Sequence, residues 1–132
     1  VNQMRSAKAQ LDTYAKLLKD NDRMASLIEK GKALSRRINS WEENLIQAKQ
    51  KTFQDVINFN NKLNVQLINL KNYIDQPDPK VTNGAKERFN DLMEDWLVYK
   101  NERDAIIEIE MNTYNALYKS LDIPALIIKN KK

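Results

Sequence analysis

The side chains best suited to proton transfer in this 132-residue chain are pairs of neighbouring carboxylates. A general acid–base pair needs two carboxyl groups that converge on one pocket from different structural elements. Each pair here belongs to a single helical stretch and is accompanied by lysine or arginine, so we interpret the pairs as parts of solvated helix faces. The pairs are Glu42 with Glu43, Glu94 with Asp95, Glu102 with Asp104, and Glu108 with Glu110.

Two ionisable residues, Arg103 and Glu110, fall instead on the apolar seam of a predicted helix. We expect either a buried ion pair at this seam or long side chains whose charged ends reach water. A functional pocket that uses the two side chains is the alternative hypothesis.

The chain has no histidine and no cysteine. It therefore lacks the residues of histidine-based acid–base catalysis, of Ser-His-Asp and Cys-His nucleophilic sites, and of HExxH zinc sites. A transition-metal site would have to consist of oxygen ligands alone, which such metals disfavour. Gly31 and Gly84 stand alone, so the sequence has no glycine-rich phosphate loop. We predict no catalytic residue, no metal site and no cofactor, and we do not expect this chain by itself to be an enzyme.

The densest basic group has no aromatic residue among its members, and the net charge of the chain is only +4. A nucleic-acid surface needs more positive charge and a platform on which bases stack, so we expect no nucleic-acid partner. The group consists of Lys30, Lys32, Arg36 and Arg37. No apolar run approaches the roughly 18 residues of a membrane span, so we also expect no span.

The composition favours helices, because 2 glycines and 3 prolines are too few for the many turns of a β-protein. Apolar residues recur at alternating steps of three and four from Met4 to Ala48, which predicts one helix over about 2–50. This pattern passes through Asp20–Asp22 without a change of phase. The alternative is a break near Asn21, where Asn or Asp would cap a new helix. We favour the unbroken helix, because phase is usually lost at a turn.

A second helix is predicted over 59–75, with Asn58 as its N-cap, and a third over 83–120, with Thr82 as its N-cap. Proline-containing segments stop both helices, since proline disfavours helix in the residue before it. The aromatic residues of the chain fall mostly on the helical seams, where we expect core packing; they are Trp41, Trp96, Tyr14, Tyr99 and Tyr114. We therefore predict an all-α, antiparallel bundle of three long helices, or four if the first breaks near Asn21, in a single domain over 1–132.

An apolar tail over 123–128 follows the third helix. Four consecutive apolar residues beyond a helix must pack somewhere, either against the end of the bundle or against a part of the protein that this chain lacks. The candidate interface residues are Ala125, Leu126, Ile127 and Ile128.

The stretch from Thr52 to Asn64 resembles a "t-x-Q-D-x-x-N-(F/Y)-P-x-x-L-N" stretch near the C-terminus of large bacterial sortilin-type β-propeller proteins. Those proteins carry BNR repeats and are often labelled as glycosyl hydrolases. The residues that carry the resemblance are Gln54, Asp55, Asn58, Phe59, Leu63 and Asn64. Val81–Ala85 and the closing Leu121–Ile127 are similar to further parts of the same pattern. The sequence departs from it at Asn60 and Val81, where the family usually has proline.

The resemblance implies a C-terminal helical domain of a larger secreted or periplasmic propeller protein, and the propeller itself would be the main partner. The leading hypothesis is accordingly a non-catalytic structural or interaction module with an extracytoplasmic location. One alternative is an oligomerising coiled-coil module, in which a second copy covers apolar residues left exposed around Met4, Leu11 and Leu18. Another is a bundle that completes a glycosidase-like propeller site through exposed groups at Asp55–Asn61. Neither the identity of the partner nor the activity of the parent protein follows from the sequence.

Overall fold

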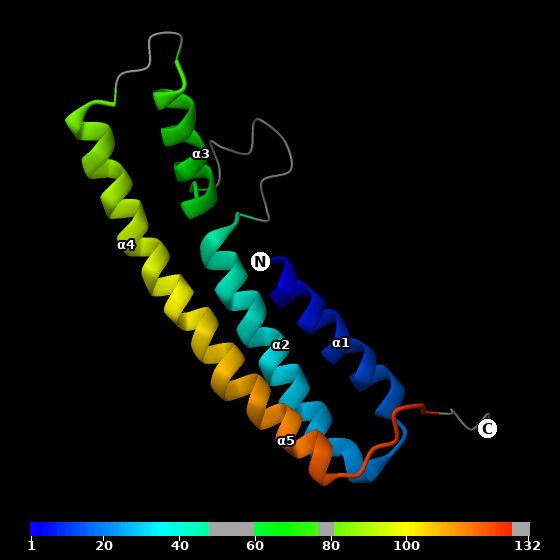
Figure 1. Ribbon diagram of the computed structural model, residues 1–132. Helices are drawn as coiled ribbons and strands as arrows, with labels where there is room; N and C mark the ends of the chain where they lie inside the picture. The colour runs from blue at the N-terminus through cyan, green and yellow to red at the C-terminus, as the bar shows by residue number, and fades with distance from the viewer. Residues whose placement is uncertain (48–59, 77–80, 128–132) are drawn as a thin grey trace. The chain divides into compact units, whose positions relative to one another are not determined.

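The computed structural model describes residues 1–47, 60–76 and 81–127, and these residues form helices and loops without any strand. The all-α class is therefore confirmed. The helical elements in chain order are α1 (Asn2–Leu18), the short 3-10 helix η1 (Asp22–Met24), α2 (Ala25–Leu45), α3 (Leu63–Ile74), α4 (Asn83–Ala105), the π-helical segment η3 (Ile106–Met111) and α5 (Asn112–Ser120) (Figure 1). Because α4, η3 and α5 follow one another without a break, the described chain contains four long helical stretches.

The prediction of one unbroken helix over 2–50 is wrong, because the helix ends at Leu18 and a new one starts after a tight turn. Asn21 has an extended backbone, and its side chain accepts a hydrogen bond of 3.1 Å from the Arg23 N–H, as an N-cap residue does. Leu18 and Met24 are nevertheless both buried. In an antiparallel hairpin the apolar faces of both helices point toward one core. The regular spacing of apolar residues therefore continues in the sequence although the helix is interrupted.

The two later helices match their predicted ends more closely. Thr82 caps α4 as expected, since its side-chain oxygen accepts a hydrogen bond of 3.1 Å from the Ala85 N–H. Helix then continues from Asn83 to Ser120, the range predicted for the third helix. The second helix begins at Leu63 rather than at residue 59, because Asn60–Lys62 are not helical. Its predicted cap, Asn58, lies outside the described residues.

The π-helical segment η3 coincides with an irregular spacing of the seam. Ile106, Glu110 and Tyr114 follow one another in two successive steps of four residues, eight in total. Two turns of an α-helix take only about 7.2 residues, whereas a π turn, bonded from i to i+5, takes up an additional residue. Side chains reinforce the end of this segment, where the Thr113 hydroxyl donates to the Ile109 carbonyl oxygen at 2.6 Å. The π segment thus keeps Ile106 and Tyr114 buried on the same face.

The chain divides into two compact units, which are described separately. The first unit comprises Val1–Ser40 and Asp104–Lys132, and the second comprises Trp41–Arg103. In the first unit, α1 and the adjoining part of α2 form an antiparallel pair (Figure 1), and α5 contacts α2 at Gly31 through Tyr114 and contacts α1 through the rings of Tyr118 and Tyr14. Its core consists of apolar residues from all these elements, namely Met4, Leu11, Leu18, Met24, Leu27, Leu34, Ile38, Ile106 and Tyr114.

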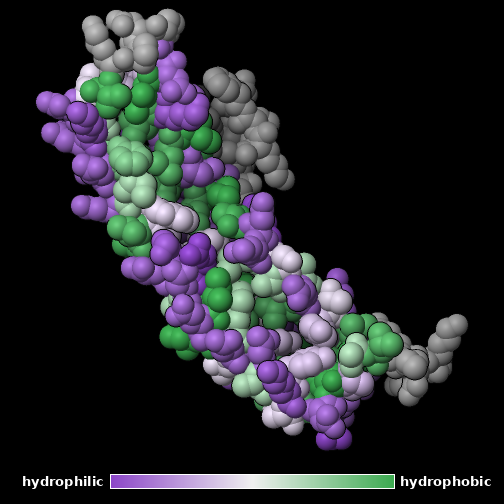
Figure 2. All heavy atoms as spheres, in the orientation of Figure 1, coloured by the Kyte–Doolittle hydropathy of each residue, from purple (hydrophilic) through white to green (hydrophobic). Residues whose placement is uncertain are grey.

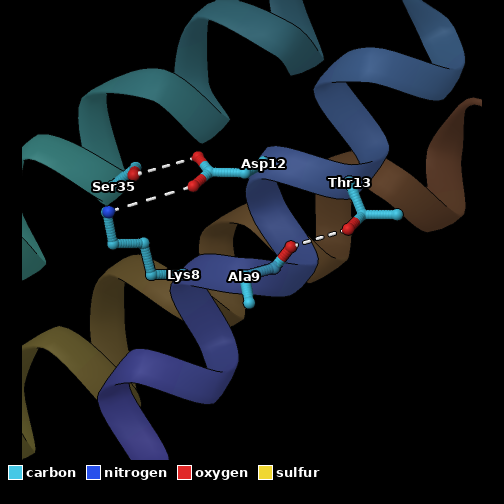
Figure 3. Close-up of polar contacts among 5 residues, drawn as sticks. All are labelled: Lys8, Ala9, Asp12, Thr13 and Ser35. Atoms are coloured by element: carbon cyan, nitrogen blue, oxygen red, sulfur yellow. Dashed lines mark hydrogen bonds and ion pairs between the residues drawn. The ribbon is translucent and has the colours of Figure 1, made fainter.

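Polar and steric contacts fix how the three helices of the first unit pack. The buried Ser35 hydroxyl of α2 donates to the Asp12 carboxylate of α1 at 3.3 Å (Figure 3). Tyr114 of α5 lies against the backbone of α2, because a Cβ atom built on Gly31 would lie only 3.2 Å from Tyr114 Cε2. The absence of a side chain at Gly31 therefore permits the close approach of α5 to α2.

The second unit has fewer buried residues in its described part. Trp41 is fully buried and donates its indole N–H to the Tyr99 carbonyl oxygen of α4 at 2.8 Å. The helices α3 and α4 run antiparallel (Figure 1), and Arg88 of α4 donates to the side-chain oxygen of Gln66 in α3. The remaining buried apolar residues of this unit are Leu45, Leu63, Ala85 and Leu92.

A residue with positive φ ends α5 and reverses the chain. Asp122 has φ 49, a left-handed conformation that L-residues adopt at a cost, and its N–H donates to the Lys119 carbonyl oxygen at 3.2 Å. Glycine is the usual residue at this position after a helix, because it has no Cβ atom to strain. Pro124 follows two residues later, where it prevents further helix.

We expect Asp122→Gly to raise the free energy of unfolding by about 0.5–1 kcal/mol, because it relieves the left-handed strain. Urea denaturation followed by circular dichroism measures this change. Asp75→Gly is the matched control, since Asp75 also ends a helix but has φ −80. There the substitution should lower stability, and a gain of equal size at both positions would contradict the explanation.

We expect Thr113→Val to lower the free energy of unfolding by about 0.5–1 kcal/mol. The Ile109 carbonyl oxygen accepts its backbone bond from Asn112, three residues on, a geometry poorer than that of an α-helix. The hydrogen bond from the Thr113 hydroxyl therefore contributes more to stability there than it would in a regular helix. Thr13→Val is the control, because Thr13 is also exposed and donates to the Ala9 carbonyl oxygen at 2.8 Å within the regular helix α1 (Figure 3). Equal losses for both variants would show that the π segment is not reinforced in this way.

Candidate functional site

No group of three or more side chains able to ligate a metal ion occurs within residues 1–47, 60–76 and 81–127. Glu110 contacts Arg37 of α2, with 3.5 Å between Oε1 and Nε, and both side chains remain about two-fifths exposed. Of the two alternatives for the seam, a buried ion pair or side chains whose charged ends reach water, Glu110 fits the second, and its partly exposed ion pair contributes at most about 1 kcal/mol.

The residues that carry the family resemblance are only partly described. Gln54, Asp55, Asn58 and Phe59 lie outside the described residues. Leu63 is buried at the start of α3, and Asn64 follows it. The Asn64 Oδ1 atom is buried and accepts no hydrogen bond from any described residue. The hypothesis that exposed groups at Asp55–Asn61 complete a glycosidase-like site therefore stays a prediction, because most of these residues lie outside the described ranges.

The apolar tail lies beside α1 in the first unit. Ala125, Leu126 and Ile127 form one wall of a cleft of 540 Å³, and the outer face of α1 forms the other. Ile127 is partly buried, whereas Leu126 is 86% exposed. The described part of the candidate interface thus packs along the bundle, and Leu126 is its most exposed side chain. Ile128, the fourth candidate residue, lies outside the described part, and whether this segment is an interface stays a prediction.

A second cleft lies between α1 and α5 in the first unit, and we call it the tyrosine cleft. It has a volume of 260 Å³ and lies where the π segment passes into α5. Its lining residues are Ala7, Gln10, Leu11, Tyr14, Leu34, Met111, Tyr114 and Asn115. The apolar pattern of the sequence placed Tyr14 and Tyr114 in the core and did not predict this cleft. The signal that could have indicated it was the pair of four-residue steps on either side of Glu110.

Burial raises the pKa of the Tyr114 hydroxyl above its ordinary value, and the neighbouring Tyr14 and Tyr118 add to this effect. The rings of Tyr14 and Tyr118 meet edge to face, with 5.2 Å between their centroids. Because folding raises the Tyr114 pKa, the folded chain binds more protons than the unfolded chain above pH about 10, and stability falls as the pH rises through this range. At neutral pH the hydroxyl is therefore an uncharged hydrogen-bonding group.

Apolar side chains of the second unit remain at the surface along α4 (Figure 2). Phe89 is 48% exposed and Leu97 is 49% exposed, and Met93 between them is partly buried. Residues four apart lie on the same face of a helix, so the three form one row, which we call the α4 row. Phe89 and Leu97 are thus exposed on a helix whose Leu92 is fully buried.

The surface expected around the first helix is absent from the described structure. Met4, Leu11 and Leu18 are all buried, because α2 and α5 cover the face of α1 that an isolated helix would expose. The coiled-coil hypothesis thus loses the exposed residues on which it depended. Among the helices of the described ranges, none has both the length and the apolar character to cross a lipid bilayer.

No protein-family model, curated protein or solved structure matches this chain. The resemblance to the C-terminal domain of sortilin-type propeller proteins therefore stays a prediction, and with it the extracytoplasmic location. The class that the structure itself defines is an all-α helical bundle.

We expect Ile127→Ala to lower the free energy of unfolding by about 1 kcal/mol, because Ile127 is partly buried beside α1. Leu126→Ala is the control and should change stability by less than about 0.5 kcal/mol, since that side chain is almost fully exposed. Thermal or urea unfolding of both variants measures the difference. If both changes are negligible, the tail does not pack on the bundle.

Proposed function

We propose that this chain is a non-catalytic helical module that docks onto another part of its parent protein through the α4 row. The observation that carries this proposal is the exposure of Phe89 and Leu97 on one face of α4. Isolated apolar residues are common at protein surfaces, whereas apolar residues aligned on one helix face are typical of a contact surface.

The surroundings of the α4 row fit a docking surface. Exposed charged residues alternate with the row along α4, among them Arg88, Asp91 and Glu94. An apolar centre with a charged and polar rim is the usual composition of a protein–protein contact. The row also continues from the buried seam of the second unit, because Leu92 lies next to Met93 and is fully buried. A partner that covers the row would therefore extend an existing apolar core.

The chemistry of the chain supports a non-catalytic role. The sequence contains neither histidine nor cysteine, which are the usual side chains for proton transfer or nucleophilic attack near neutral pH. In the ranges that the structure describes, no group of carboxylates could hold a metal ion. Docking needs only shape and apolar area, which the helices supply.

For the partner, we propose a β-propeller of the same parent protein, on the strength of the resemblance around Leu63 and Asn64. An extracytoplasmic location belongs to this proposal. The complete coding sequence tests it directly, since a signal peptide and propeller repeats should precede Val1. If another kind of domain precedes it, the propeller is the wrong partner, while docking through the α4 row remains testable against that domain.

We expect Phe89→Ser and Leu97→Ser each to weaken binding of the chain to the separately produced N-terminal part of its parent protein by at least about tenfold. Isothermal titration calorimetry measures the affinity. Val98→Ser is the matched control, because Val98 is 64% exposed but lies about 100° around the helix from Leu97. It should leave the affinity unchanged.

All three variants should keep the melting temperature of the chain within about 2 °C, since the substituted side chains are exposed. Equal weakening by Val98→Ser would show that the α4 row is not the docking face. Light scattering of the chain alone distinguishes the remaining alternative: a concentration-dependent dimer that Leu97→Ser dissociates would identify a second copy as the occupant of the row.

A further inference from the structure

The tyrosine cleft has the layout of a small-molecule site. Its floor is apolar and buried, formed by Leu11, Leu34 and the ring of Tyr114, which is only 6% exposed. Its rim carries the exposed amide side chains of Gln10 and Asn115. Ligand sites in proteins typically combine an apolar interior with a few polar groups that orient the ligand. We propose that this cleft binds a small, uncharged aromatic molecule with one hydroxyl group, of the size and chemistry of phenol.

The volume of the cleft decides the size of the ligand. Helical cores are packed to nearly the density of organic crystals, and most gaps between side chains are no larger than a water molecule. A volume of 260 Å³ is well above that size. An apolar cavity of about 150 Å³ is large enough to bind benzene. The tyrosine cleft therefore has room for one aromatic ring and a polar substituent.

The side chains that line the cleft decide the chemistry of the ligand. None of them is ionisable at neutral pH, because the two tyrosines are the only titratable groups among them. A charged ligand would lose its hydration without gaining an opposite charge. The rings of Tyr14 and Tyr114 offer contacts to an aromatic ring, and the amides of Gln10 and Asn115 at the rim offer hydrogen bonds to a hydroxyl group.

The π segment is the second, independent observation that points to this cleft. Met111, the last residue of η3, lines the cleft, and Tyr114 and Asn115 lie one turn further along α5. Single π turns within α-helices occur frequently at functional sites. Removal of one residue from the helix would rotate all later side chains by about 100°, so the π segment determines that these three side chains face α1.

The cleft is distinct from the surface proposed for docking, because it uses none of the residues of the α4 row. It is also distinct from the cleft beside the tail, although Gln10 and Tyr14 border both. Ala7 lines only the tyrosine cleft and Ala9 lines only the cleft beside the tail. These two alanines of α1 therefore allow the clefts to be filled one at a time.

The test titrates the full 132-residue chain, labelled with ¹⁵N, with phenol and follows the backbone amide resonances by NMR. We expect saturable shifts centred on Leu11, Met111 and Asn115, with a dissociation constant of about 1 mM or lower. Benzoate and benzylammonium, which carry a full charge, should bind at least about tenfold more weakly. Equal binding of the charged compounds, or phenol shifts that do not saturate, would overturn the proposal.

Paired substitutions locate the binding. Ala7→Leu should fill the tyrosine cleft and weaken phenol binding at least about tenfold, whereas Ala9→Leu should leave it unchanged. Met111→Ala should enlarge the cleft and shift the preference from phenol toward the larger 2-naphthol. If Ala9→Leu abolishes binding and Ala7→Leu does not, the ligand occupies the cleft beside the tail and the proposal is wrong. If phenol does not bind, the proposal of docking through the α4 row is unaffected. If the α4 row does not dock, the proposal for the tyrosine cleft is likewise unaffected.

Discussion

The close approach of α5 to α2 at Gly31 is the contact on which the packing of the first unit depends. A glycine inside a helix costs about 0.5–1 kcal/mol relative to alanine. The cost is offset here, because the missing side chain leaves space for the ring of Tyr114, which is almost fully buried. Leu11 of α1 also lies within contact distance of the same point, at 3.8 Å from a Cβ atom built on Gly31. Three helices therefore meet around one glycine and one tyrosine.

The π segment η3 places Tyr114 so that it can make this contact. Ile106 has no exposed surface and Tyr114 has little, and both belong to the core of the first unit. A regular α-helix would carry Tyr114 gradually away from the face that Ile106 defines, since two turns take about 7.2 residues and the chain has eight. The wider turn of η3 absorbs the difference and keeps Tyr114 directed at Gly31. Two side-chain hydrogen bonds offset part of the energetic cost of the π geometry. Asn112 donates to the Glu108 carbonyl oxygen, and Thr113 donates to the Ile109 carbonyl oxygen.

Periodicity in the sequence was sufficient for the helical class, for the range 83–120 and for the cap at Thr82, because each depends on residues close together in the chain. It failed at Asn21, since a hairpin and a continuous helix can bury the same seam residues. The four-residue steps around Glu110 could have indicated the irregular turn beside the tyrosine cleft, but not the lining of the cleft, because its walls come from α1, α2, η3 and α5, which meet only in the fold.

Among the described residues, buried apolar side chains are distributed unequally between the two units. Most of the fully buried ones belong to the first unit, whereas Phe89, Leu97 and Val98 of the second unit are about half exposed or more. Burial of apolar surface contributes about 25 cal/mol per Å² removed from water, so the described core of the first unit is the larger source of stability. A partner that covers the α4 row would add the same kind of free energy to the second unit. Folding of the chain and the docking proposed for the α4 row would then depend on the same physical effect, the removal of apolar surface from water.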